Sequence, residues 1–98
     1  MVGFEWDPVK EVLNVRKHGV DFTTASLIWD SSVVERVDNR EYGEVRFQAF
    51  GVAESRVLTV IYTWRGQTRR IISARRSSRR EQSFFETQIQ RVGRPPQD

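Results

Sequence analysis

The chain has 98 residues, of which 38% are hydrophobic and 30% are charged, as expected for one small soluble domain. It contains no cysteine, which excludes disulfides and thiolate metal sites and agrees with a reducing compartment. The first residues lack a basic segment followed by an apolar one, and no apolar run is long enough to span a membrane, so we expect a cytoplasmic protein.

Charge is distributed unevenly along the chain. Residues 1–64 hold 7 basic and 10 acidic side chains, a sum of −3, whereas residues 65–98 hold 9 basic and 3 acidic side chains, a sum of +6. Every basic residue of the second part is arginine, which grips phosphate with two N–H groups and stacks on bases. This bias favours a polyanion, or an acidic protein that imitates one, as the partner.

A short strand over 4–6 is followed by the start of a helix. Asp7 is a good N-cap and Pro8 fits the first helical position, so we predict a helix over 8–18 that ends at Gly19. Its core-facing stripe is expected to be Val9, Val12 and Leu13.

A second helix is predicted from Asp21, its N-cap, to about residue 29. Its apolar residues recur at helical spacing, and the Asp30-Ser31-Ser32 segment ends it. These apolar residues are Phe22, Ala25, Ile28 and Trp29.

Four strands are predicted next, over 33–38, 44–52, 56–64 and 68–74, with turns over 39–43 and 65–67. The strand over 56–64 is apolar on both faces and should be central. In the strand over 44–52, Val45, Phe47 and Ala49 should share one face, and Arg46, Gln48 and Phe50 the other. Strict alternation in the last strand places Arg70, Ile72 and Ala74 on one face, and Arg69, Ile71, Ser73 and Arg75 on the other.

The chain should close with one more helix. Ser78 and Glu81 have the spacing of a capping box, and Phe85, Ile89 and Val92 form the expected core stripe. We predict one domain over residues 1–92 and a disordered tail over 93–98. Strands connected by hairpins, with helices on one face of their sheet, indicate the α+β class. We expect two layers, one of helices and one sheet.

Several segments, in unbroken order over roughly residues 4–85, resemble the BrnT family of toxins. They are Phe4–Pro8, Asn14–Val20, Phe22, Glu44–Phe47, Gly51, Tyr62–Gly66, Arg70–Arg76 and Glu81. The Arg-Ile-Ile-Ser-Ala-Arg-Arg block over 70–76 is the most specific of them. The chain departs from the family pattern at Ser77, where alanine is frequent, and at Trp64, where an acidic residue is common.

The resemblance implies a RelE-like fold and the toxin half of a type II toxin–antitoxin pair. It implies an endoribonuclease that inhibits translation and is neutralised by a BrnA-like antitoxin with a ribbon-helix-helix domain. The pair would repress its own promoter, with operator DNA contacted only through the antitoxin. A homodimer or a toxin–antitoxin heterotetramer is expected, and no membrane partner.

Cleaving RNA without a metal requires a base for the 2′-hydroxyl, cations for the phosphate and an acid for the leaving oxygen. The cations are evident, and we expect Arg70, Arg75 and Arg76 to bind the phosphate, the last two beside a helix start that favours anions. The alternative is a merely solvated basic face.

Proton-transfer groups are harder to identify. His18 is the only histidine and titrates near neutral pH, but a cation at a helix end also has a purely structural explanation. Tyr62 would qualify if its hydroxyl faced the arginines, and otherwise belongs to the edge of the core. Arg46 either reaches the phosphate or pairs with Glu44.

The predicted site divides into two groups. The catalytic candidates are His18, Arg46, Tyr62, Arg70, Arg75 and Arg76, and the RNA-binding candidates are Lys17, Arg65, Arg69, Arg79 and Arg80. Trp29, Trp64 and Phe50 are either base-stacking or core residues. With one histidine and no cysteine, we expect no metal and no cofactor. A non-catalytic module that binds nucleic acid or an antitoxin, acting in transcriptional autoregulation, is the alternative function.

Overall fold

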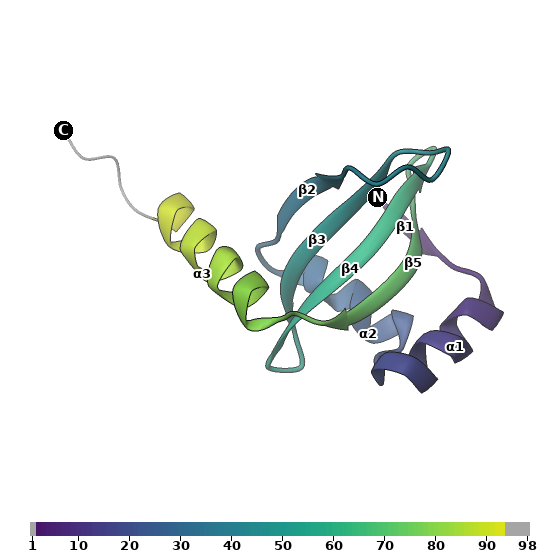
Figure 1. Cartoon of the computed structure of the whole chain (residues 1–98), viewed down its shortest axis with the longest axis horizontal. Coiled ribbons are helices and arrows are strands. Elements are labelled where there is room, and N and C mark those ends of the chain that lie inside the picture. Colours follow the sequence, from purple (N-terminus) through teal and green to yellow (C-terminus); the bar gives the residue numbers. More distant parts are fainter. Residues whose placement is uncertain (1, 94–98) are drawn as a thin grey trace.

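The computed structural model describes residues 2–93, in which helices pack on a five-stranded sheet (Figure 1). In chain order the elements are β1 (Gly3–Glu5), α1 (Pro8–His18), α2 (Phe22–Ser26), the 3-10 helix η1 (Leu27–Asp30), β2 (Val34–Asp38), β3 (Arg46–Ala53), β4 (Arg56–Arg65), β5 (Thr68–Arg76) and α3 (Arg79–Gly93). The α+β class is confirmed. Of the predicted tail, only Gly93 lies among the described residues, where it ends α3.

The strand order is β1-β5-β4-β3-β2, so β4 is central, as predicted. Strands β2 to β5 pair antiparallel, but β1 pairs parallel with β5, with Phe4 opposite Arg69. The predicted hairpin strands are thus antiparallel, and the N-terminal strand makes the sheet mixed at this edge. The chain enters the sheet beside its last strand, and the two run in the same direction.

A β-bulge in β5 changes the direction of its side chains. Tyr62 of β4 lies opposite Ile71, whereas Ile61 lies opposite Ser73, so Ile72 is an extra residue. Because one inserted residue reverses the alternation, Ile71 and Ala74 both enter the core. The predicted assignment of faces was wrong beyond Ile72.

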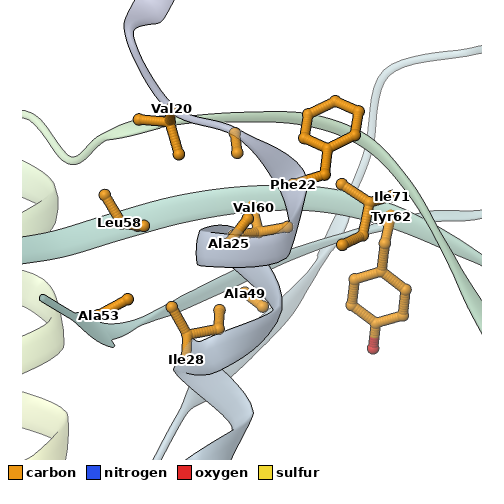
Figure 2. Packing of buried hydrophobic residues seen from close by; sticks show 11 residues of the cluster. Val20, Phe22, Ala25, Ile28, Ala49, Ala53, Leu58, Val60, Tyr62 and Ile71 are labelled. Atoms are coloured by element: carbon orange, nitrogen blue, oxygen red, sulfur yellow. The ribbon is translucent and has the colours of Figure 1, made fainter. Parts of the chain in front are cut away.

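The core lies between α2, η1 and one face of the sheet (Figure 2). Phe22, Ala25 and Ile28 are fully buried there. They meet a layer from the strands made of Ala49, Ala53, Leu58, Val60, Tyr62, Ile71 and Ala74. We call this side the helix face, and the opposite side of the sheet the open face.

Helix α1 lies against the edge of the sheet rather than over its face. Its buried residue is Asn14, whose amide donates to the carbonyls of Val20 and Ala74, both at 2.8 Å, and accepts from the Ala74 N–H at 3.1 Å. The predicted core stripe was wrong: Val9, Val12 and Leu13 are 66%, 52% and 56% exposed. Hydrogen bonds, rather than apolar packing, join this helix to β5.

Helix α3 projects from one end of the sheet (Figure 1) and touches the open face there. Phe84 meets Phe50 edge-on at 5.7 Å, so the expectation that all helices share one face was wrong for α3. Phe85 is buried and Ile89 half-buried, whereas the side chain of Val92 lies outside the described part. No helix among residues 2–93 is long and apolar enough to cross a membrane.

Candidate functional site

The open face brings together polar side chains from two adjacent strands. Because of the bulge, Arg70, Ser73 and Arg75 of β5 all lie on this face, opposite Thr63, Ile61 and Thr59 of β4. The structure thus places two of the three arginines predicted to bind phosphate on one side of the sheet. Arg76 lies opposite Leu58, a core residue, and therefore belongs to the other side.

Arg75 is held by Glu81 at the start of α3. Its two terminal nitrogens donate to the two carboxylate oxygens at 2.6 and 2.9 Å, and the Glu81 carboxylate also accepts from the Ser78 N–H at 2.8 Å. The capping box is confirmed, since the Ser78 hydroxyl accepts from the Glu81 N–H at 3.2 Å. The hydrogen bond from Arg75 is the main cause that lowers the pKa of Glu81 to about 2, and the same bond raises the pKa of Arg75. Both groups are therefore charged at neutral pH.

Arg70 has a carboxylate partner too. Its guanidinium donates to Glu5 of β1 at 2.5 Å, and both side chains remain partly exposed. Arg70 and Arg75 are thus each oriented by a carboxylate. An arriving phosphate meets fixed donors and competes with these carboxylates for them.

His18 and Lys17 lie at the end of α1, beside the edge of β5. A hollow of about 240 Å³ separates α1 from β5, and its lining includes Lys17, His18 and Ser73. Partial burial, followed by the charges of Lys17 and Arg75, lowers the pKa of His18. The imidazole is therefore neutral near pH 7 and near enough to Arg75 to sense its charge. A neutral imidazole can accept a proton.

A third group of cations surrounds the loop between β2 and β3. Arg46 pairs with Glu44 at 3.1 Å and lies over the Tyr42 ring, and its contact with a phosphate stays a prediction. Arg65 reaches the same carboxylate at 3.6 Å. Arg40 forms a two-pronged pair with buried Asp38 and acts on Arg75 through its charge.

Two candidates lie on the helix face instead. The Tyr62 hydroxyl donates to Glu35, and burial together with that hydrogen bond raises its pKa to about 12. The arginine beside Tyr62 is Arg69, 5.4 Å from the ring centroid, whereas Arg70 and Arg75 lie on the open face. Arg69 lies among aromatic rings beside it.

The remaining candidates differ in exposure. Arg79 and Arg80 are exposed in the first turn of α3. Phe50 is fully buried and Trp29 packs against the core, whereas Trp64 is 38% exposed. Of the three aromatic residues considered for base stacking, Trp64 is therefore the most accessible.

Four residues that were not predicted as site residues complete this arrangement. Asn14 fixes α1, and Glu5 and Glu81 orient the arginines. Arg40 adds a cation from a segment predicted only as a turn. A polar residue at a helical core position was the available signal for Asn14, whereas the others depend on strand register.

Comparison with known families gives the decisive observation. The family described as a ribonuclease toxin, BrnT, of type II toxin–antitoxin systems matches residues 6–81. The chain belongs to the BrnT family. The matched segment begins at Trp6, contains His18, Arg70 and Arg75, and ends at Glu81, the residue that holds Arg75.

A solved BrnT structure shows the same fold. The crystal structure of the Brucella abortus ribonuclease toxin, BrnT, matches with a TM-score of 0.61 and 24% identity, covering 81% of this chain and 100% of that one. No curated protein sequence matches the chain closely enough to be reported as a relative. Family membership supports a general ribonuclease activity within a type II toxin–antitoxin system.

Proposed function

We propose that this chain is a metal-independent endoribonuclease whose scissile phosphate binds on the open face at Arg70 and Arg75. The observation that carries the proposal is that the bulge aligns these arginines on one face, beside the hollow that contains His18. Guanidinium groups supply the charge stabilisation that a metal would otherwise provide. Among residues 2–93, no three histidine, aspartate or glutamate side chains gather as metal ligands would.

The proposed chemistry begins with neutral His18 accepting the proton of a 2′-hydroxyl. The 2′-oxygen attacks phosphorus, the bond to the 5′-oxygen breaks, and the leaving oxygen takes a proton from water. Arg70 and Arg75 neutralise the charge that gathers on the phosphate oxygens. The products are a 2′,3′-cyclic phosphate and a 5′-hydroxyl.

In the cell, cleavage of messenger RNA would inhibit translation, and a partner antitoxin would restrain it. We propose a BrnA-like ribbon-helix-helix antitoxin as that partner, assembled with the toxin in the cytoplasm as a heterotetramer that contacts operator DNA through the antitoxin. Two features support a surface that binds a polyanion such as RNA. Basic residues, all arginine, exceed acidic ones after residue 64, and Arg70 and Arg75 are held on one face of the sheet by carboxylates.

The test is incubation of the pure protein with a long single-stranded RNA in EDTA, followed by analysis of the product ends. We expect cleavage with cyclic or 3′-phosphate ends, and its loss in Arg70→Ala/Arg75→Ala. Arg16→Ala removes an exposed arginine from α1 and is the control. Salt-dependent RNA binding without cleavage would favour the non-catalytic binding module instead.

A further inference from the structure

A second pocket lies on the helix face, at the end of the sheet that η1 does not cover. Its volume is about 360 Å³, and it is lined by Glu35, Arg36, Val37, Phe47, Tyr62 and Trp64. Val37 is 51% exposed and Trp64 38% exposed, so its mouth is accessible to solvent. We call it the aromatic pocket.

The rings of the aromatic pocket are held in place from behind by a cation. The Arg69 guanidinium lies 4.7 Å from the Trp64 ring centroid, 5.4 Å from that of Tyr62 and 4.5 Å from that of Trp29. Its Nε is buried and has no hydrogen-bond partner within residues 2–93. Phe47 stacks on Tyr62 at 5.4 Å with an angle of 25° between the rings. The pocket therefore offers pre-arranged flat surfaces, the requirement for stacking a planar ligand.

Glu35 adds a hydrogen-bonding edge to this pocket. It is an exposed residue of β2, and one oxygen of its carboxylate accepts from the Tyr62 hydroxyl, which fixes its orientation. An ionised carboxylate is only an acceptor and has about four lone-pair positions, so positions remain for a ligand. The matching ligand is planar and presents N–H donors along one edge.

Among the RNA bases, guanine has two adjacent donors on its Watson–Crick edge, N1–H and N2–H₂. Adenine and cytosine present a donor beside an acceptor, and uracil presents one donor between two carbonyls. We propose that the aromatic pocket binds a guanine base, stacked on Trp64 or Phe47 with its donor edge toward Glu35. The inference rests on the proposed ribonuclease function and names a feature of its substrate.

The aromatic pocket and Arg70 lie near the same end of the sheet, on opposite faces. Trp64 and Thr63 are consecutive residues of β4 whose side chains point to opposite faces, and Thr63 lies opposite Arg70. Arg65, the last residue of β4, is exposed at the turn that joins β4 to β5. An RNA strand passing round this turn would place a phosphate near Arg70 and a neighbouring base in the aromatic pocket.

The first test measures the binding of the four nucleoside 5′-monophosphates to the complete chain. Tryptophan fluorescence and calorimetry give the four affinities. The phosphate is common to all four, so differences between them report the base. We expect GMP to bind about tenfold more tightly than the others, and Glu35→Gln or Trp64→Ala to remove that preference. Val9→Ala, an exposed change on α1, should leave it unaltered.

The second test maps cleavage sites in a long RNA for the same variants. Cleavage beside guanines in the wild type, with relaxed site choice in Trp64→Ala and Glu35→Gln, would support the inference. Cleavage with identical sites in all variants would overturn it while leaving the ribonuclease proposal intact. Selective binding of GMP without cleavage of RNA would overturn the ribonuclease proposal and leave the guanine pocket intact.

Equal affinity for all four nucleotides, or no binding by any, would also overturn the guanine assignment. Tighter binding of L-argininamide than of GMP, lost in Glu35→Gln, would identify the pocket as a site for an arginine of a protein partner. Far-ultraviolet circular dichroism of each variant checks that the fold is retained.

Discussion

Glu81 combines two roles at one residue: it caps α3 and holds Arg75. Its pKa is lowered to about 2 by that pairing, so the carboxylate contributes stability above its ordinary pKa, and this stability is lost as the pH falls through 4.5 toward 2. Glu81→Gln keeps hydrogen-bonding atoms but removes the charge.

We expect Glu81→Gln to lower the free energy of unfolding near neutral pH by about 1–2 kcal/mol, allowing for the partial exposure of Arg75. Urea denaturation at neutral pH and at about pH 3 measures this, and the difference from the wild type should shrink in acid. Glu86→Gln, at an exposed position of the same helix, is the control. A deficit equal at both pH values would contradict the assignment.

His18 carries a prediction about activity. Because its pKa is lowered, the neutral form that serves as a base already dominates near pH 7. The cleavage rate should rise with pH below about 6.5 and then level off. His18→Gln should lose about 10²–10⁴-fold in rate together with that pH dependence. A variant with the same profile as the wild type would show that another group accepts the proton.

The sequence shows the residue types of a candidate site, but the face of the sheet on which each side chain lies depends on the register of strand pairing. His18, Arg70 and Arg75 of the proposed site were predicted from residue type and family resemblance alone. Their division between faces depends on Ile72, an extra residue that alternation does not reveal. Arg76 and Tyr62 were grouped with the others by residue type and resemblance too, and they lie on the other side of the sheet.

At the scale of elements, α1 shows how an apolar pattern can mislead. Its exposed valines and leucine have the spacing of a core stripe, yet the helix is attached through the side chain of Asn14. The boundaries of α1 were predicted correctly, because caps are local features. Its packing was not, because the edge of β5 is distant in sequence.

Asn14→Leu should therefore be more damaging than Leu13→Ala. The first leaves the Ala74 N–H and two carbonyls without partners, and we expect a loss of about 2–4 kcal/mol in the free energy of unfolding. The second truncates an exposed side chain and should cost less than about 1 kcal/mol. Thermal or urea unfolding of both variants measures the order, and the reverse order would contradict this attachment.

The β3–β4 turn offers a stabilising change. Glu54 and Ser55 have positive φ values of 52° and 64°, a conformation that side chains other than asparagine and glycine adopt at a cost. Glu54→Asn/Ser55→Gly should raise the free energy of unfolding by about 1 kcal/mol and the Tm by about 4–8 °C. Calorimetry measures this change, and an unchanged or lower Tm would argue that the turn is not strained.

At the scale of the whole molecule, the sheet separates two differently equipped surfaces. The open face carries arginines held by carboxylates, and the helix face carries the core and, at one end, the aromatic pocket. The fold class and most elements followed from the sequence because hydrophobic period and turn residues are local signals. Sheet edges, the bulge and the position of α3 depend on contacts between distant segments.

Two neighbouring arginines provide a test of whether RNA is cleaved on the open face. Arg75 lies on that face and Arg76 on the other, so Arg75→Ala and Arg76→Ala remove the same charge from adjacent positions. The initial rate of cleavage of one RNA in EDTA should fall about 10²–10³-fold in Arg75→Ala and by less than about threefold in Arg76→Ala. Equal losses, or a larger loss in Arg76→Ala, would contradict the account.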